Sequence, residues 1–470
     1  MKKINIFLFA TILALSSLMF SCTEKNLEPT LSQHKDIATS INNVQDLVGI
    51  LNGAYNRMSL QPYYGRDVIL YGEVRTDNAF SNGASGRIIT PSTMKMGPED
   101  GHATDTWISI NRVISSANLI ISKKDVELKG DKDVKSQVIG QAYAIRALAH
   151  YDLLRLYGQQ HITGGATPDG IPYITNFKPE GESSLAKRNT VSEVKTMIYK
   201  DLDDALSLMK TAQNPKSKQF ISTYAVQAIK ARVALYFGEW DIVKANCEPI
   251  ISSGKYSVIP KDDFVAHWAK KNPVNSIFEI AASPTDSEEI NGLAYIYRSP
   301  VGEKGYGDVR TFVKIKDLFD ANDVRASNPM IRMQGSFMTN FGKYPSMDYS
   351  DDIFIIRYEE VLLSYAEALA RTSGDALTYL NMVASQRGIA AYTTATVEDI
   401  LKERRRELIF EGFRFDDIVR NKMTIPTMPA TFSKEKQPSG CPEYGNYRYA
   451  FPIPAREMNA NPNMTQNKGY

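Results

Sequence analysis

Hydrophobic residues recur at helical spacing over most of this 470-residue chain. Between Asp105 and Lys124, for example, apolar residues stand three or four positions apart, which places them on one face of a helix. The same spacing predicts further helices at 135–157, 191–209, 224–237, 241–251, 355–371, 376–386 and 397–410. Small residues such as Ala142 and Ala231 let paired helices approach closely. The pattern therefore predicts a mainly α-helical, TPR-like scaffold of helix pairs, although no strict repeat of about 34 residues is visible.

Long stretches interrupt this helical pattern. Residues 63–101 are rich in Gly, Ser, Asp and Asn, and residues 158–188 form a Gly/Pro connector. Residues 260–349 combine scattered glycines and many tyrosines with two strand-like pieces, 276–281 and 293–297. Insertions of this length in a helical scaffold are usually functional or disordered, so we expect these segments to carry more of the function than the helices do.

The N-terminus predicts export and a lipid anchor. Two lysines precede an apolar run, 4–20, that is short for a membrane span and typical of a signal peptide over residues 1–21. The run ends at Cys22 in a loose lipobox, LMFSC, so we expect cleavage before Cys22 and acylation of its thiol. Residues 22–36 then form a polar, lipidated tether. The alternative is an ordinary secretory signal with an incidental cysteine.

Composition excludes several classes of function. The formal net charge is only +2 and no strong basic block is present, which argues against nucleic-acid binding. After cleavage only Cys247 and Cys441 remain, too few for a disulfide scaffold, and the sequence leaves open whether they pair. Neither cysteine has a CxxC neighbour or a nearby histidine, so we expect no metal site and no cofactor.

Catalytic motifs are missing from the sequence as well. It contains no HExxH, GxSxG, P-loop or EF-hand pattern. Glu359 and Glu360 point about 100° apart on a helix, so they cannot face each other as a glycosidase pair would. We expect Arg357, Glu360, Glu367 and either Arg405 or Arg406 to form structural ion pairs, and we predict a binding protein and not an enzyme. The acidic run Asp348, Asp351 and Asp352 fits helix N-terminal charge better than calcium, which stays open.

The segment Glu403–Arg420, ERRRELIFEGFRFDDIVR, interleaves charged and bulky apolar residues. A solvated helix separates the two kinds on opposite faces. Some of these charges should therefore lie beside the core and need partners, and we predict a buried pair between Glu411 and Arg414. The alternative is one long solvated helix.

This segment and several others resemble, in order along the chain, the sequence motifs of the RagB/SusD family. The matching stretches are LVGILNGAYNRM (47–58), GQAYAIRALAHYDLLRLYG (140–158), RNTVSEV (188–194), STYAVQAIKARVALYFGEWDIV (222–243), SIFEI (276–280), IRYEEVLLSYAEAL (356–369) and FPIPAREMNANPNMTQNKGY (451–470). One departure is Glu359, which stands where the family pattern has a small residue.

The resemblance implies a single SusD-like helical domain over residues 37–470. It also implies a nutrient-binding lipoprotein of the outer membrane, anchored at the cell surface, that delivers its ligand to a SusC-like TonB-dependent transporter. Oligosaccharide is the ligand that we expect first, and oligopeptide is the rival because the chain is short and its loops lack Trp. A hydrolase and a surface protein without a ligand are further alternatives.

In this family, ligands bind among the loop after the first helix and the insertion after the SIFEI-like strand, here near 63–101 and 260–349. The candidate aromatic platforms are Tyr63, Tyr64, Trp268, Tyr295, Tyr297 and Tyr306. The candidate polar partners are Arg75, Asp77, Asn78, Asn82 and Arg310. Trp107 and Trp240 lie in helix motifs, so we expect them in the core.

Overall fold

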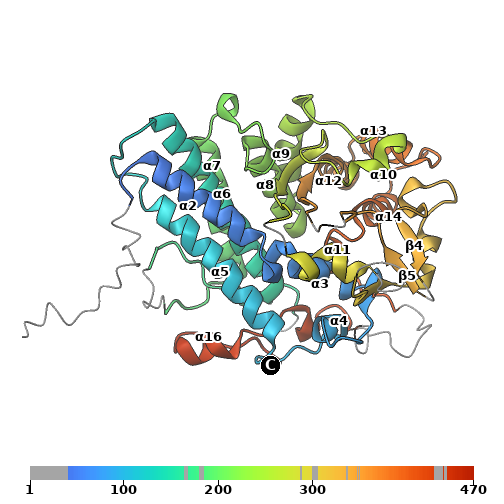
Figure 1. Cartoon of the computed structure of the whole chain (residues 1–470), viewed down its shortest axis with the longest axis horizontal. Helices are drawn as coiled ribbons and strands as arrows, with labels where there is room; N and C mark the ends of the chain where they lie inside the picture. The colour runs from blue at the N-terminus through green and yellow to red at the C-terminus, as the bar shows by residue number, and fades with distance from the viewer. Residues whose placement is uncertain are drawn as a thin grey trace, which may run out of the picture.

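The computed structural model describes residues 41–162, 168–178, 185–285, 288–298, 305–334, 337–346, 348, 350–427, 438 and 442–470. The predicted signal peptide, the tether with Cys22, and Cys441 lie outside the described residues. The protein is mainly helical, as the periodicity predicts. Long, roughly parallel helices fill one side of the molecule, and shorter helices with a small sheet fill the other (Figure 1).

Most of the following helices agree closely with the predicted ranges, whereas α15 has no counterpart among them. They are α2 (Val44–Met58), α5 (Gly101–Ile121), α6 (Lys132–Tyr157), α7 (Val191–Leu208), α8 (Thr223–Phe237), α9 (Trp240–Ser252), α12 (Tyr358–Arg371), α13 (Leu377–Ala384), α14 (Val397–Leu408) and α15 (Arg414–Arg420). The shorter ones are a π-helix (Gln61–Gly65), α3 (Asp67–Val74), α4 (Ile89–Thr93), α10 (Phe264–His267), α11 (Leu293–Tyr297) and α16 (Ala455–Ala460). Short 3₁₀ segments occupy Thr211–Gln213, Lys261–Asp263, Glu289–Asn291, Val313–Leu318, Val324–Ala326, Ser385–Arg387 and Tyr447–Tyr449.

Local sequence fixes many of the helix ends. Asn43, Thr190 and Thr396 each form a capping box that satisfies the first free backbone N–H groups of α2, α7 and α14. At the C-terminal end of α8, Gly238 adopts the left-handed conformation with φ of 73°. These caps explain why the periodic ranges and the observed helices nearly coincide.

Two small antiparallel sheets accompany the helices. The first has the order β1 (Ala79–Ser81), β3 (Val309–Thr311), β5 (Phe337–Asn340), β4 (Ile331–Gln334). The second pairs β2 (Ser276–Ile280), as predicted, with β6 (Ile353–Arg357). β6 occupies the start of the predicted helix 355–371, because the β-branched residues before Arg357 pair with β2.

Two predictions for the insertions are wrong. The strand-like piece 293–297 is a helical turn, α11, in which four of five residues are buried; short apolar runs do not distinguish buried strand from buried helix. The first predicted loop region, 63–101, contains α3, which is buried along its whole length. Its polar residues made it resemble a loop, but they bind interior partners.

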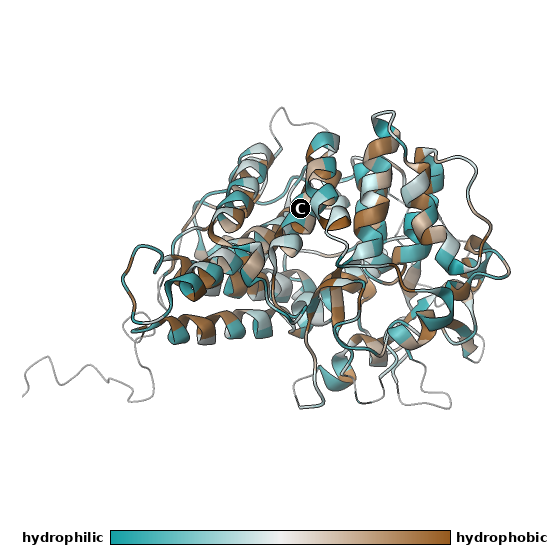
Figure 2. Ribbon diagram, turned by 90° about the horizontal axis from the view of Figure 1, so that it is seen from above, coloured by the Kyte–Doolittle hydropathy of each residue, from teal (hydrophilic) through white to brown (hydrophobic). Residues whose placement is uncertain are grey.

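The core runs through the whole molecule. α6 packs against α5 and α7, and small residues such as Ala142 and Ala147 are fully buried between these helices. Brown, hydrophobic residues alternate with teal, hydrophilic ones along the helices in Figure 2, as one-sided burial requires. Trp107 lies in this core, as predicted, and Cys247 is a buried free thiol. Among the described helices, none combines the length and the hydropathy that a membrane crossing needs.

The charged segment 403–420 is not one solvated helix. It breaks into α14 and α15 at Gly412, whose φ of 88° is left-handed. α3 approaches this joint so closely that a Cβ on Gly72 would lie 1.9 Å from the Gly412 carbonyl oxygen. Glycine at both positions therefore allows the two backbones to touch.

The charges around this joint are buried and paired, but the predicted pair between Glu411 and Arg414 does not form. Glu411 accepts hydrogen bonds from Arg357 and Lys343, while Arg414 donates to Asp77 at 2.9 Å. The bend at Gly412 turns the two side chains toward different elements. The structural ion pairs that the sequence predicts elsewhere are confirmed. Glu360 pairs with Arg232, Glu367 with Arg420, Arg405 with Asp77, and Arg406 with Asp320.

Glu407 is the centre of this buried network. Arg325, Arg357 and Arg387 all donate to its carboxylate, at 2.7 to 3.0 Å. Burial raises the pKa of Glu407, but these guanidinium charges outweigh burial and hold the pKa well below its ordinary value. We call Arg325, Arg357, Arg387, Glu407 and Glu411 the buried charge network.

Candidate functional site

The two predicted ligand regions meet at the edge of the four-stranded sheet. β1 lies in the first region and β3 lies in the second, and they pair with Phe80 opposite Arg310. Just beyond the paired residues, the Asn82 N–H donates to the Asp308 carbonyl at 2.9 Å, and Asn82 Nδ2 donates to the Gly307 carbonyl at 2.6 Å. The sheet register therefore brings loop 82–88 against residues 305–310.

Two of the predicted tyrosines come together at this edge. The rings of Tyr295 and Tyr306 meet edge to face, with their centroids 4.7 Å apart. The Tyr306 N–H also donates to the Tyr295 carbonyl at 2.8 Å, so the backbone fixes their spacing. Both side chains are half-buried, which leaves part of each ring at the surface. A rigid aromatic pair of this kind supplies contact area at a small entropic cost.

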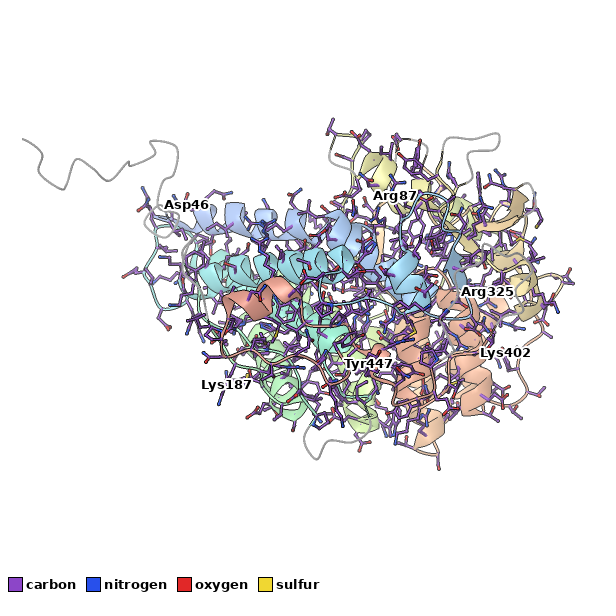
Figure 3. The ribbon with its side chains drawn as sticks, turned by 90° about the horizontal axis from the view of Figure 1, so that it is seen from below. Asp46, Arg87, Lys187, Arg325, Lys402 and Tyr447 are labelled. Atoms are coloured by element: carbon purple, nitrogen blue, oxygen red, sulfur yellow. The ribbon has the colours of Figure 1, made fainter. Side chains whose placement is uncertain are left out.

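Two charged groups outside the predicted set complete the arrangement. The Arg87 guanidinium lies over the Tyr306 ring, 4.1 Å from its centroid, and Arg87 Nη1 is 3.1 Å from Asp308 Oδ2. The side chain of Asp308 is buried, whereas that of Arg87 is 33% exposed. Figure 3 labels Arg87 near the yellow helix α11. No local pattern marks Arg87 or Asp308, because the strand pairing that unites them is long-range.

Arg310 lies beside this group. Its Nε donates to the Gly307 carbonyl at 3.0 Å, and its side chain is half-buried. Burial lowers the pKa of the Arg310 guanidinium below its ordinary value, and the charge of Asp308 opposes that shift. We call Asn82, Arg87, Tyr295, Tyr306, Asp308 and Arg310 the tyrosine–arginine cluster.

The structure places the other predicted residues in the interior. Tyr63 and Tyr64 both donate their hydroxyls to Asp152, at 2.6 and 2.7 Å, and burial raises the pKa of both phenols well above its ordinary value. Arg75 donates to the Tyr449 carbonyl at 2.7 Å. These three side chains therefore stabilise the packing of the first region on the core.

Asp77 and Asn78 are held by the C-terminal segment. Asp77 pairs with Arg414 and Arg405, and Asn78 accepts from Arg405 Nε at 2.9 Å while donating to Glu73. Neither side chain faces solvent.

Trp268 and Tyr297 are also buried. Tyr297 stacks on Tyr344, and Trp268 packs under the charges of Lys343 and Arg357. Of the predicted set, Tyr295, Tyr306 and Arg310 therefore keep exposed surface that a ligand could touch, and Asn82 is buried beside them.

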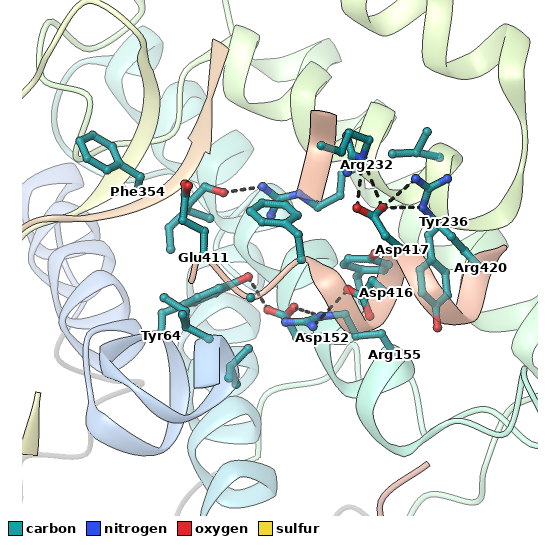
Figure 4. Close-up of a pocket in the computed structure, with 18 residues that line it drawn as sticks. Tyr64, Asp152, Arg155, Arg232, Tyr236, Phe354, Glu411, Asp416, Asp417 and Arg420 are labelled. Carbon is teal, nitrogen blue, oxygen red and sulfur yellow. Dashed lines mark hydrogen bonds and ion pairs between the residues drawn. The ribbon is translucent and has the colours of Figure 1, made fainter. Parts of the chain in front are cut away.

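The interior also contains a small polar cavity, which differs from the tyrosine–arginine cluster in having no room for a ligand. It has a volume of about 40 Å³ and is crossed by hydrogen bonds and ion pairs, among them Tyr64 to Asp152, Arg155 to Asp416 and Arg420 to Asp417 (Figure 4). A space of this size accommodates a few water molecules at most and no sugar unit. Within the described part of the chain, no group of three or more His, Cys, Asp or Glu residues is placed to hold a metal ion.

Comparisons with known proteins identify the scaffold. A family model described as "SusD family" matches residues 319–470, and a second, described as "Starch-binding associating with outer membrane", matches residues 28–235. The chain belongs to the SusD/RagB family. Proteins of this family bind and do not catalyse.

The relatives match different shares of the chain. SusD-like protein P2 of Formosa agariphila is 25% identical over 90% of this chain and 92% of its own. Starch-binding protein SusD of Bacteroides thetaiotaomicron is 32% identical, but over 120 residues, 25% of this chain and 22% of its own.

Solved structures show the same fold. A SusD superfamily protein from Bacteroides thetaiotaomicron superposes with a TM-score of 0.81 at 24% identity, covering 90% of this chain and 99% of that one. Surface glycan-binding protein A from Bacteroides fluxus gives 0.74 at 22% identity, covering 91% and 100%.

Proposed function

We propose that this protein captures oligosaccharides at the cell surface and delivers them to a SusC-like TonB-dependent transporter of the outer membrane. The observation that carries the proposal is the tyrosine–arginine cluster, where two separated insertions place half-exposed rings beside half-exposed guanidinium groups. The names of the relatives support a glycan as the ligand, since they include a starch-binding protein and a surface glycan-binding protein.

The cluster offers the groups that a sugar ring needs. The C–H face of a sugar packs against an aromatic ring, here Tyr306 or Tyr295. Hydroxyl groups accept hydrogen bonds from guanidinium N–H groups, here of Arg87 and Arg310. The backbone bonds that fix Tyr295, Tyr306 and Asn82 hold these groups in place before a ligand arrives, which lowers the entropic cost of binding.

Transport and anchoring are further parts of the proposal. Release to a transporter suits a modest affinity, on the order of micromolar, which corresponds to about −8 kcal/mol. Acyl chains on Cys22 would hold the protein at the membrane through the tether 22–36. The match of residues 28–235 to the model described as associating with the outer membrane supports this location.

Incubating the purified protein with separate oligosaccharide and oligopeptide mixtures tests the proposal. After washing, the retained molecules are released and analysed by mass spectrometry. We expect intact oligosaccharides. Cleaved sugars would contradict a binding protein, and retention of peptides alone would replace the sugar ligand with the rival class.

Anchoring is tested by the Cys22→Ala variant, which removes the thiol that receives the acyl chains. We expect the variant to lose its tight membrane association when cells are fractionated. A variant that stays as tightly bound as the natural protein would contradict lipid anchoring.

A further inference from the structure

A second surface feature lies away from the tyrosine–arginine cluster and shares no residue with it. It is a groove of about 560 Å³, formed where the start of α7, the junction of α8 and α9, and the ends of α12 and α15 meet. This size falls in the range of small-ligand sites, roughly 300–1,000 Å³. We call it the cationic groove; the side chains that define it are Phe237, Trp240, Tyr444, Lys195, Arg371 and Lys422.

Aromatic rings form the apolar part of this groove. Phe237, Trp240 and Tyr444 are half-buried, so part of each ring faces the groove. The helix motif predicts Trp240 in the core, but Trp240 is only half-buried and packs against the edge of the core. The chain turns at Gly238 between α8 and α9, and a Cβ on Gly238 would stand 3.4 Å from the Trp240 ring. Trp240 is the first residue of α9 after this turn, and it lines the groove.

The charges along the groove have one sign. Among the described residues, no Asp or Glu lines it. Lys195 lies over the Phe237 ring and Arg371 over the Trp240 ring, at 5.3 and 4.8 Å from the centroids. The carboxylates that pair with these cations, Glu239 and Glu367, are not part of the lining.

Lys422 provides the uncompensated charge. Within the described part of the chain its Nζ has no hydrogen-bond or ion-pair partner, and its side chain is exposed. Its backbone is left-handed, with φ of 56°, a conformation that a lysine rarely adopts. His161 adds no charge at neutral pH, because burial lowers the pKa of its imidazole to about 4.

We propose that the cationic groove is a second carbohydrate site, which takes an acidic sugar unit bearing a carboxylate or a sulfate group. The rings would pack against the sugar, and Lys422 with the outer N–H groups of Arg371 and Lys195 would face its anionic group. A neutral sugar would leave the Lys422 ammonium unpaired, whereas the anionic group of an acidic sugar would pair with it. This inference rests on glycan capture and adds the charge of the ligand.

Two pairs of matched probes test the charge of the ligand. Oligogalacturonate is compared with its methyl ester, and a κ-carrageenan oligosaccharide is compared with a neutral agaro-oligosaccharide. We expect at least one acidic probe to bind about tenfold or more tightly than its neutral counterpart, and the pair that shows the preference identifies carboxylate or sulfate. The preference should weaken in high salt. Equal affinity within both pairs would overturn the proposal.

Two variants locate the binding. Trp240→Ala should weaken the binding of the acidic probe about tenfold or more. If the alanine variant does not fold, Trp240→Phe, which keeps an aromatic ring, replaces it. Lys422→Asn removes the charge but suits the left-handed backbone, so the melting temperature should stay the same. The affinity for the acidic probe should fall, and that affinity should depend less on salt. Lys270→Asn, at an exposed lysine outside the groove lining, is the matched control and should change nothing.

The results separate this site from the proposed function. Suppose that Tyr306→Ala loses neutral-sugar binding, while Trp240→Ala and Lys422→Asn bind the acidic probe like the natural protein. This result would overturn the site proposed in the cationic groove and leave glycan capture standing. Loss of the acidic probe in the groove variants alone would support the groove even if Tyr306→Ala had no effect.

Discussion

The tyrosine–arginine cluster and the buried charge network use the same kinds of side chain in opposite ways. In the network, the side chain of Arg357 is 2% exposed and its guanidinium bonds to Glu407 and Glu411. In the cluster, the side chain of Arg87 is 33% exposed, and among the described residues its one ion pair is with Asp308. A guanidinium that is enclosed and fully bonded stabilises the fold, whereas one with N–H groups facing water can exchange water for a ligand. Exposure, more than residue type, separates the scaffold residues from the candidate site residues in this protein.

The largest expected effect comes from breaking the network at its centre. Glu407→Ala leaves three buried guanidinium groups without their shared carboxylate, which should lower the free energy of unfolding by about 3–5 kcal/mol or prevent folding. Denaturant unfolding measures the change. Glu398→Ala removes an exposed carboxylate from the same helix and should cost less than about 1 kcal/mol, so equal costs would contradict the distinction.

A buried histidine should make the scaffold sensitive to acid. His150 Nδ1 donates to the Arg146 carbonyl and its Nε2 accepts from the Ile174 N–H, so the fold requires the neutral ring. Burial lowers the pKa of His150 from 6.5 to about 3. The unfolded chain therefore binds a proton first, and stability falls as the pH drops from about 6.5 toward 3.

The expected loss at pH 4 is about 3 kcal/mol from this group. Unfolding curves at several pH values check it, with His150→Gln as the non-titrating comparison. The stability difference between the natural protein and the variant should shrink as the pH falls. A constant difference would contradict the linkage.

A smaller effect tests the partner of Arg414. Because Asp77 keeps Arg405 when Arg414 is lost, Arg414→Ala should cost about 1–3 kcal/mol. A double-mutant cycle should give a coupling energy between Arg414 and Asp77 and none between Arg414 and Glu411. Coupling to Glu411 would restore the pair that the sequence predicted.

The sequence predicts the scaffold well, because periodicity and capping are local. Thr190 and Thr396, for example, mark helix starts within four residues of sequence. It does not predict which polar residues are exposed. Asp77 looks like a loop residue, yet its partner Arg414 lies 337 positions away. The candidate cluster depends on the long-range pairing of β1 with β3. The region in the sequence points to Tyr295 and Tyr306 as candidates, but no sequence pattern points to Arg87 or Asp308.

The variant Tyr306→Ala should change the stability least and the binding of the ligand most clearly. Tyr306→Ala removes a half-buried ring from the tyrosine–arginine cluster. Tyr224→Ala is a matched control: Tyr224 is also half-buried, meets Tyr256 edge to face, and carries the Lys255 ammonium over its ring. Both variants should melt close to the natural protein, because both rings are partly exposed.

Calorimetric titration of the natural protein and these two variants with the oligosaccharide that it retains is the most direct test of glycan capture by the tyrosine–arginine cluster. We predict that Tyr306→Ala weakens binding about tenfold or more, equal to about 1.4 kcal/mol, and that Tyr224→Ala leaves the affinity unchanged. Unchanged affinity in Tyr306→Ala, or an equal loss in both variants, would contradict the assignment of the ligand to this cluster.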